Sequence, residues 1–339
     1  MRRGSGIPEI LSKKSVKEHL ASSAFGNCAD MNRSNLIVYV GTIMAMRFSA
    51  GVLSLGMMLT ACGGGGVNST PTPTPTPVVY NTVAELFAKP GDKSFQVSGV
   101  SWEGQLGVFQ GGSHTFPFGD GFTIEFLDAD NTYRVSIKGG ATYDFTPSTL
   151  TMQSDDRVQY FLRSYPQQQS FEIAIPSVQN VPLSYTRFAT LSVIEEQNYT
   201  YTNYYGAWGV PTRDMPKTGT ATYDLALFGA ATHDNVVLGL AKHSGGKLSA
   251  NFASGAVTTD LSFSAEINGN VTLIGTLTGN ATIASGTSGF GGTLSGSDGG
   301  SGVFGGGFFG PKAAEVGYTW WYDGPEMHSS QGTAAGPKH

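Results

Sequence analysis

The chain contains two cysteines, and the position of one of them suggests a specific chemistry. Cys62 stands directly after the apolar segment 46–61, "MRFSAGVLSLGMMLTA", and directly before four glycines. A thiolate is a strong nucleophile, so a cysteine between a membrane-inserting segment and a flexible linker could accept an acyl group at a membrane surface. Cys28 lies further upstream, and two cysteines in this stretch give neither a disulfide framework nor a zinc motif.

The segment before Cys62 has the layout of a secretory signal. One arginine, Arg47, precedes an apolar stretch that ends in small residues and is too short to span a bilayer comfortably. Leu59-Thr60-Ala61-Cys62 resembles the bacterial lipobox, which implies diacylglyceryl transfer to the thiol and cleavage that leaves Cys62 as the first residue. The alternative is a cysteine that happens to follow an apolar helix. Gly63 stands where an aspartate would resemble an inner-membrane retention signal, which favours the outer membrane.

Residues 1–45 fit this scheme poorly because they are first polar and then apolar again. We interpret them as an N-terminal extension upstream of a start at Met46. A longer signal that begins at Met31 is the alternative. On either interpretation the signal ends at residue 61, and acyl chains such as palmitate on Cys62 would hold the protein on the membrane, since each buried methylene contributes about 0.8 kcal/mol.

A tether is predicted over residues 62–78. Alternating Thr and Pro in "TPTPTPTP" favours an extended polyproline II spacer, although a Pro-rich docking motif is an alternative. Seven of the 20 Lys and Arg residues and three of the 25 Asp and Glu residues precede Cys62, so the chain from Cys62 onward carries 13 positive and 22 negative side chains. This acidic balance gives no reason to expect a nucleic-acid partner.

The rest of the chain predicts an all-β protein, since it is rich in glycine and short β-prone runs and only 13% of its residues are charged. Residues 79–216 are expected to form a sheet-rich domain. In "TYRVSIK", Tyr133, Val135 and Ile137 alternate with polar residues, which predicts a strand with one buried face. Residues 82–88 are predicted to form one short helix.

The stretch 199–208, "YTYTNYYGAW", carries five aromatic side chains. They are Tyr199, Tyr201, Tyr204, Tyr205 and Trp208. Aromatic loops often mark binding surfaces, because these side chains bury much area at a small cost in conformational entropy. The alternative is a strand whose aromatic residues pack against its neighbours. The five residues are candidate ligand contacts on the first interpretation.

Residues 217–322 predict eight short antiparallel strands joined by tight Gly and Asn turns. The predicted strands cover residues 219–228, 246–254, 258–267, 270–279, 280–285, 290–296, 301–310 and 314–322. Eight up-and-down strands close well into a small barrel. A transmembrane porin is excluded, because the outward positions carry Asp, Ser and Thr instead of an apolar band. Residues 323–339 are expected to be a disordered tail.

Three motifs of this region resemble a known family. "DMPKTGTATY" (214–223), "LSANFASGAV" (248–257) and "GGSGVFGGGFFGPKAAEVGYTW" (299–320) are similar to the β-barrel domain of transferrin-binding protein B and of related factor H-binding-protein-like and haemophilin-like surface lipoproteins. The resemblance covers about 105 residues and extends upstream through "YGAWGVPTRDMP", which looks like the junction between that family's handle domain and its barrel.

The resemblance implies a handle followed by an eight-stranded antiparallel up-and-down barrel. It also implies a lipid-anchored solute-binding protein of the outer membrane that captures an iron-carrier protein or haem at the cell surface. An outer-membrane export partner and a TonB-dependent receptor would then be its partners. The family's transferrin receptors have two handle–barrel lobes and this chain has room for one, so the resemblance does not identify the ligand. A periplasm-facing structural lipoprotein without a nutrient ligand is the alternative.

We expect no enzyme and no metal site. The chain after Cys62 contains no Gly-x-Ser-x-Gly elbow, no His-Glu-x-x-His motif and no Walker loop. Haem is the one cofactor considered, because the haemophilin-like relatives suggest that His114, His233 or His243 could be an iron ligand. Surface or turn histidines are the interpretation that we favour.

Overall fold

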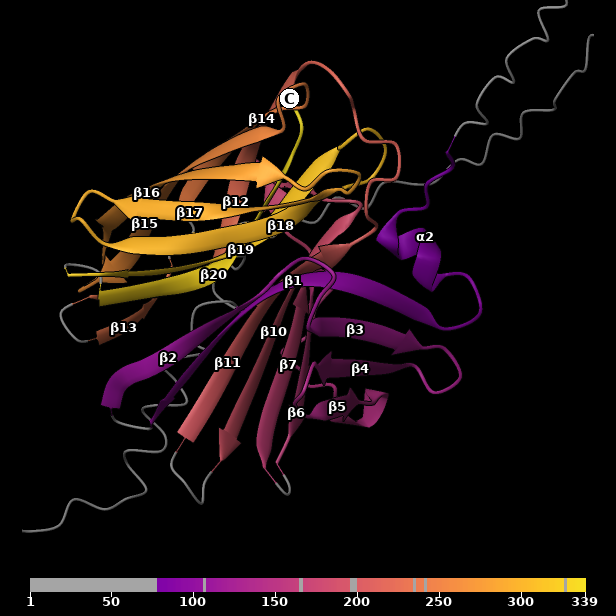
Figure 1. Ribbon diagram of the computed structural model, residues 1–339. Coiled ribbons are helices and arrows are strands. Elements are labelled where there is room, and N and C mark those ends of the chain that lie inside the picture. Colours follow the sequence, from indigo (N-terminus) through magenta and orange to yellow (C-terminus); the bar gives the residue numbers. More distant parts are fainter. Residues whose placement is uncertain are drawn as a thin grey trace, which may run out of the picture. The chain divides into compact units, whose positions relative to one another are not determined.

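The structure is a computed structural model, and it describes residues 78–105, 108–164, 167–195, 200–233, 236–240, 243–325 and 328–339. The predicted extension (1–45), the signal (46–61), Cys62 and the tether up to residue 77 lie outside these residues. The described chain is almost entirely antiparallel sheet, as predicted, and Figure 1 shows its two large sheets. No helix in the described part of the chain is long and apolar enough to cross a membrane.

The first sheet forms the handle. Its order is β5-β4-β3-β1-β11-β10-β7-β6, and β2 pairs with β1 beside β11 and β3. The strands are β1 (Lys93–Gln105), β2 (Val108–Phe116), β3 (Phe122–Leu127), β4 (Thr132–Ile137), β5 (Thr142–Phe145), β6 (Val158–Arg163), β7 (Gln168–Ala174), β10 (Thr186–Glu195) and β11 (Thr200–Gly209). A small hairpin, β8 (Ser177–Val178) with β9 (Val181–Pro182), connects β7 to β10, and the 3-10 turn η2 (Pro147–Thr149) follows β5.

The predicted short helix is α2 (Val83–Phe87). It begins at a capping box, in which the Thr82 hydroxyl accepts the Glu85 N–H and the Glu85 carboxylate accepts the Thr82 N–H. Phe87 packs against Phe126 at 5.0 Å between ring centroids. The helix therefore covers one end of the handle core.

The handle sheet curves around an apolar interior. Alternate residues of its strands point inward, and most of them are aromatic or branched, such as Phe122, Phe145, Phe171, Leu191 and Trp208, all with no exposed side-chain surface. Phe145 and Phe171 stack at 5.0 Å. Every strand from β1 to β11 except β2, β8 and β9 supplies at least one buried hydrophobic residue to this core.

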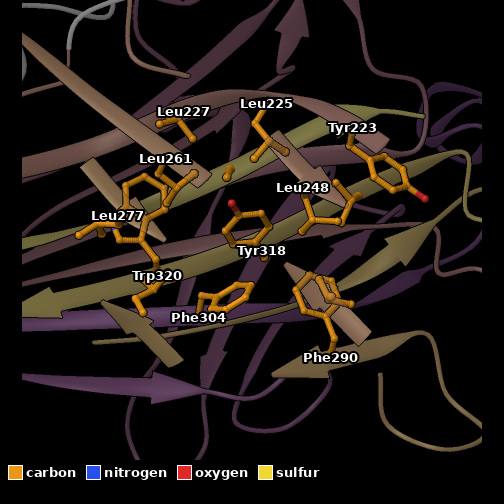
Figure 2. Close-up of a cluster of buried hydrophobic side chains, with 14 of the residues drawn as sticks. Tyr223, Leu225, Leu227, Leu248, Leu261, Leu277, Phe290, Phe304, Tyr318 and Trp320 are labelled. Carbon is orange, nitrogen blue, oxygen red and sulfur yellow. The ribbon is translucent and has the colours of Figure 1, made fainter. Parts of the chain in front are cut away.

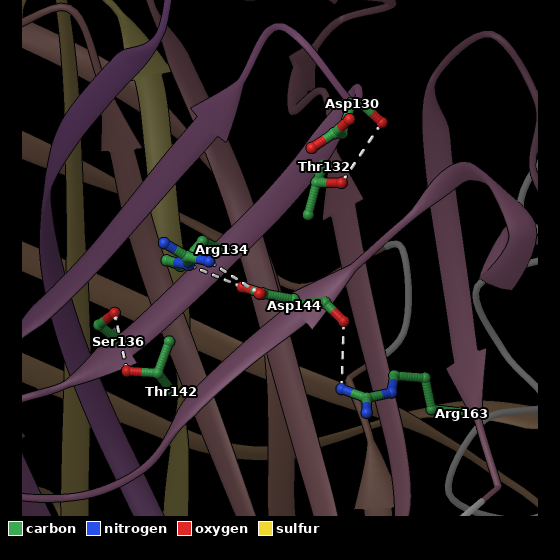
Figure 3. Close-up of polar contacts among 7 residues, drawn as sticks. All are labelled: Asp130, Thr132, Arg134, Ser136, Thr142, Asp144 and Arg163. Carbon is green, nitrogen blue, oxygen red and sulfur yellow. Dashed lines mark hydrogen bonds and ion pairs between the residues drawn. The ribbon is translucent and has the colours of Figure 1, made fainter.

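The two edge strands of the handle, β5 and β6, meet at a seam that side chains bridge (Figure 3). The Arg163 guanidinium on β6 donates to the Asp144 carbonyl oxygen on β5 at 3.1 Å. Arg134 on β4 holds the Asp144 carboxylate through two nitrogens, at 2.8 and 2.9 Å. This bidentate pair lies on the outer face of the sheet and keeps the pKa of Asp144 below its usual value.

The second sheet is a closed barrel of eight antiparallel strands. Its order is β12-β14-β15-β16-β17-β18-β19-β20, and β12 pairs with β20 to complete the circle. The strands are β12 (Thr220–His233), β14 (Gly245–Asn251), β15 (Ala256–Ile267), β16 (Asn270–Ile283), β17 (Gly289–Gly296), β18 (Ser301–Phe309), β19 (Glu315–Gly324) and β20 (His328–Pro337). The short strand β13 (Val236–Gly239) folds back onto β12.

The number of barrel strands was predicted correctly, but two of the strands were not. Residues 270–279 and 280–285, predicted as two strands, form the single strand β16, because Gly279 and Asn280 keep pairing with Thr259 and Thr258 of β15. The eighth strand is β20, which lies within the predicted disordered tail. That prediction was wrong, since β20 pairs with both β19 and β12 and six consecutive residues, 331–336, are buried.

The barrel interior is filled by side chains from all eight strands of the ring, and Leu238 of β13 packs against them. Figure 2 shows part of this core. Trp320 and Phe263 stack at 5.5 Å, and Phe290, Phe304 and Tyr318 form a second aromatic group with centroid separations of 5.5 to 6.0 Å. The Tyr318 hydroxyl lies 2.7 Å from the Thr259 hydroxyl, so this fully buried phenol has a polar partner. The barrel is therefore a packed core around aromatic side chains.

A buried glutamate connects the barrel to the handle. Glu315, at the start of β19, accepts the backbone N–H groups of Ser184 and Tyr185 at 2.7 and 3.0 Å, just before β10. Glu315 is 6% exposed, and this burial raises the pKa of its carboxyl group against the opposing effect of the N–H donors and of Arg187. Glu315 belongs to the "FFGPKAAEVGYTW" run on which the family resemblance depends most strongly.

A second connection joins three distant segments at Asp214. Its Oδ1 accepts the Tyr80 hydroxyl at 2.5 Å and the Lys312 N–H at 2.9 Å. The Tyr80 oxygen in turn accepts the N–H groups of Arg213 and Asp214 at 2.6 and 3.1 Å. The N-terminal segment, the handle–barrel linker and the turn after β18 therefore meet at one carboxylate.

Candidate ligand-binding surface

The candidate surface lies on the outer face of the handle sheet, which is the face opposite its core. Nearest the junction this face packs on the barrel. Ser98 donates to the Gly305 carbonyl and lies 3.1 Å from the Thr319 hydroxyl, and Tyr205 contacts Phe228 of β12 at 6.2 Å between ring centroids. Further along the strands the same face is largely covered, since Trp102, Ser170 and Ser192 are 7%, 7% and 4% exposed.

Five cross-strand neighbours form a row on this face, which we call the outer row. From β6 to β1 its members are Leu162, Ser170, Ser192, Asn203 and Trp102, each directly opposite the next. Ser192 donates to the Asn203 amide oxygen at 2.6 Å. Small polar residues thus occupy the middle of the row, and larger apolar side chains stand at its two ends.

An aromatic pair stands at the β1 end of the outer row. Trp102 and Tyr201 meet edge to face at 5.1 Å, and Tyr201 is half-buried. Burial raises the pKa of Tyr201 to about 12, so its phenol is neutral and can donate a hydrogen bond at physiological pH. Trp102 is 7% exposed, so Tyr201 is the member of the pair that a ligand could contact, and Trp102 packs behind it.

The aromatic stretch 199–208 is mostly strand β11, so the loop interpretation is corrected. Trp208 has no exposed surface and packs on Phe95 at 4.7 Å, and Tyr205 is 8% exposed at the barrel contact. Tyr204 points into the handle, where it packs beside Phe116 and Phe122. Tyr199 lies outside the described residues. Tyr201 remains the candidate of this set on the outer face.

The histidines do not form a haem pocket with one another in the described part of the chain. His114 on β2 and His243 before β14 are both exposed, whereas an axial iron ligand stands in an enclosed pocket. His233 ends β12, and its side chain is not described. No cluster of three or more metal-ligating side chains occurs among the described residues.

The barrel wall offers a different kind of surface. A shallow depression of about 430 Å³ crosses β14, β15 and β16. Its lining residues are Gly246, Lys247, Asp260, Leu261, Ser262, Thr276, Leu277 and Thr278. None of these is aromatic, and the outward side chains are short or charged. The handle surface is therefore the better candidate for ligand binding.

Comparison with known proteins finds similarity in structure alone. No protein-family model matches the chain. No curated protein matches it either.

Several solved structures resemble the model at low identity. A double mutant of transferrin-binding protein B from Haemophilus parasuis is 16% identical, with a TM-score of 0.44, over 72% of this chain and 45% of that one. HpuA from Kingella denitrificans, solved in complex with human haemoglobin, is 16% identical, with a TM-score of 0.37, over 74% and 87%. The N-lobe domain of lactoferrin-binding protein B of Moraxella bovis is 12% identical, with a TM-score of 0.33, over 71% and 99%.

These matches include transferrin-binding protein B, the protein whose barrel motifs the sequence resembles. The chain spans less than half the length of the transferrin-binding protein B structure. At these identities the likeness concerns the fold alone.

Proposed function

We propose that the protein is a lipid-anchored binding lipoprotein of the outer membrane, displayed at the cell surface, that captures an external ligand through the outer face of its handle. The anchor proposal rests on the sequence 59–62, on the Thr-Pro tether and on the order of tether, handle and barrel. The binding proposal rests on one observation, the half-buried Tyr201 next to Asn203 on the outer face of the handle, with the buried Trp102 packed against its ring.

The family resemblance suggests the kind of ligand. An extracellular iron-carrier protein would use a surface of this type, because a half-buried tyrosine beside a tryptophan supplies large contact area and a polar tip. Haem is the smaller alternative, and the exposed positions of His114 and His243 make it the weaker one. An outer-membrane export partner and a TonB-dependent receptor complete the proposal.

The anchor and its location can be tested together. Intact cells would be treated with protease, and the barrel would be followed by immunoblot beside a periplasmic control protein. Loss of the barrel with survival of the control supports surface display. A protected barrel would instead favour the periplasm-facing structural lipoprotein. Cys62→Ser should release the protein from the membrane fraction, and a variant that stays attached contradicts the lipid anchor.

The binding surface is tested with Tyr201→Ala. Purified protein would be screened by surface plasmon resonance against transferrin, lactoferrin, haemoglobin and haem. Tyr201→Ala should weaken the binding of the ligand found by at least about tenfold, as expected for an aromatic contact worth more than ~1.4 kcal/mol. Thr272→Ala is the control, because Thr272 is exposed on the barrel strand β16 and belongs to neither face of the handle. An equal loss of ligand affinity in both variants would contradict the proposal that the outer row is the binding surface.

A further inference from the structure

The inner face of the handle changes character one row beyond its aromatic core. The last wholly apolar cross-strand neighbours on β6, β7 and β10 are Phe161, Phe171 and Leu191, and Tyr204 of β11 continues that row. The next inward-facing row holds mainly polar residues. From β6 to β1 this inner row consists of Arg163, Gln169, Val193, Thr202 and Glu103.

Gln169 stands near the middle of the inner row with an unpaired acceptor. The residue is 5% exposed, and its Oε1 is buried without a hydrogen-bond partner. Buried amide oxygens are rarely left unpaired, because burial removes their hydration without replacing it. The neighbouring cation, Arg163, donates to the Asp144 carbonyl. This oxygen lacks a donor among the residues that the structure describes.

Two tyrosines face the same end of the handle core. Tyr204 projects from β11, and Tyr143 projects from β5 on the other side of the curved sheet. Both are half-buried, and no hydrogen bond to either phenol is found within the described residues. Burial raises the pKa of each phenol, and the nearby Glu195 raises both further, so both are neutral hydroxyls.

The charges around these groups are mainly negative. Glu195 on β10 has the same inward orientation as Val193 and accepts the Gln167 side-chain amide at 3.4 Å, and Glu103 ends the inner row on β1, where it is exposed. Both carboxylates lie close enough to Tyr204 to affect its ionisation. Arg163 is the one cation in the row, and it lies at the opposite end from Glu103 beside the Asp144 carboxylate.

The site therefore combines acceptors, aromatic rings and negative charge. An amide oxygen, two phenol oxygens and two carboxylates would all accept hydrogen bonds, and the tyrosine rings would attract a cation. A primary ammonium group meets each of these features, since it carries three N–H donors and one positive charge. An anion would face the carboxylates and would leave the Gln169 oxygen unpaired.

We infer that the end of the handle core formed by Gln169, Tyr143, Tyr204, Glu195 and Glu103 binds a primary alkylammonium group, either as a free amine or as a lysine side chain of a bound protein. This site faces into the handle, whereas the outer row faces away from it. The two surfaces can be tested separately, and the ammonium site does not depend on the lipid anchor.

The probes are n-butylamine and Nα-acetyl-lysine amide, with Nα-acetyl-norleucine amide as the uncharged control. Binding to the full chain would be followed by ligand-observed NMR. We expect the amines to bind and the norleucine compound not to bind. Equal binding of butylamine and the lysine amide indicates a free amine as ligand, and preference for the lysine amide indicates a protein side chain. Binding of the norleucine compound as strong as that of the amines would overturn the inference.

Two variants locate the site. Gln169→Met keeps the length of the side chain and removes the acceptor, and it should weaken amine binding roughly tenfold, as should Glu195→Gln at a half-exposed position. Gln168→Met is the matched control, since Gln168 lies next in sequence and faces the other side of the sheet. Should Gln169→Met fail to fold, Glu195→Gln decides the matter alone. Unchanged amine binding in Glu195→Gln, or equal losses in the Gln168 and Gln169 variants, would contradict the inference.

Discussion

The handle and the barrel are both antiparallel sheets curved around an apolar interior, and they differ in how the curve is completed. In the barrel, β12 and β20 pair through main-chain hydrogen bonds, so every strand of the ring has two neighbours. In the handle, the edge strands β5 and β6 do not pair in the described sheet. The Arg163 side chain joins them, and a short main-chain bridge forms where the Thr151 N–H donates to the Tyr160 carbonyl of β6. The main-chain pairing gives the barrel a core that is apolar and aromatic along most of its length, with Thr259 and Tyr318 paired inside it.

The difference indicates a division of roles. A closed ring protects its strand edges and leaves few polar groups in its interior. The handle has a seam between β5 and β6, a mainly polar inner row, and the Trp102–Tyr201 pair at one end of its outer row, and the candidate binding features are in the handle. We infer that the barrel chiefly provides stability and that the handle provides recognition.

The largest expected effect tests whether the two parts unfold together. Trp320→Ala in the barrel and Trp208→Ala in the handle each remove a side chain with no exposed surface, and each should cost about 3–5 kcal/mol. Because the junction couples the two parts, both variants should lower a single melting transition in calorimetry. Two transitions, of which each variant shifts only one, would show instead that the parts are independent.

The second prediction breaks the coupling itself. Glu315→Ala leaves the backbone N–H groups of Ser184 and Tyr185 without their acceptor, and each buried donor costs about 1–3 kcal/mol. The handle transition should then separate from the barrel transition. Glu266→Ala, at an exposed barrel position, serves as control. A Glu315→Ala melt that coincides with wild type would mean that other contacts carry the coupling.

The third prediction concerns pH and has opposite signs at two carboxylates. Burial raises the pKa of Glu315 in the fold above its ordinary 4.5, so its contribution to stability is fully present below pH 4.5 and is lost as pH rises through the folded pKa. The pKa of Asp144 is lowered by Arg134, so its contribution is present above pH 3.8 and is lost as pH falls through the folded pKa. The free energy of unfolding would be measured by urea denaturation from pH 3 to 8. The loss of stability at rising pH should disappear in Glu315→Gln, and the loss at falling pH should disappear in Asp144→Asn. Parallel profiles in wild type and both variants would refute these assignments.

The smallest effect concerns the seam at neutral pH. Asp144→Asn removes the bidentate partner of Arg134 but keeps the carbonyl that accepts from Arg163. Because both charged side chains are more than one-third exposed, the melting temperature should fall by no more than about 2 °C. Arg163→Met removes the contact across the seam and should have the larger effect. A larger fall in melting temperature for Asp144→Asn than for Arg163→Met would mean that the Arg134–Asp144 ion pair, and not the Arg163 hydrogen bond, stabilises the seam.

Sequence patterns predicted the fold well where the signal is local. Alternation in 258–267 and the Gly and Asn turns indicated the barrel strands, and the helix predicted over 82–88 is α2. β20 was missed because "HSSQGTAAGP" is small and polar, and its burial arises from Trp320, Phe228 and the neighbouring strands. β16 was divided because Gly279-Asn280 is a typical turn dipeptide, although here β15 continues beside it.

The candidate sites were less predictable for a physical reason. The sequence identified the aromatic residues of β11. Alternation along the strand places Tyr201 and Tyr204 on opposite faces, but the face that each occupies can be assigned only when the register and the partner sheet are known. The inner row brings together residues from five strands that are up to 99 positions apart in the chain, such as Glu103 and Thr202. No local spacing indicates such a set.

The contact at Asp214 has a mechanical consequence. If the chain is anchored as proposed, drag on the captured ligand is balanced by tension in the tether, and this tension enters the folded body at Tyr80. Tyr80 is bonded to Asp214, which also holds the turn after β18, so the load divides between handle and barrel at its point of entry. The anchor would therefore pull on both parts together and would not peel the handle away strand by strand.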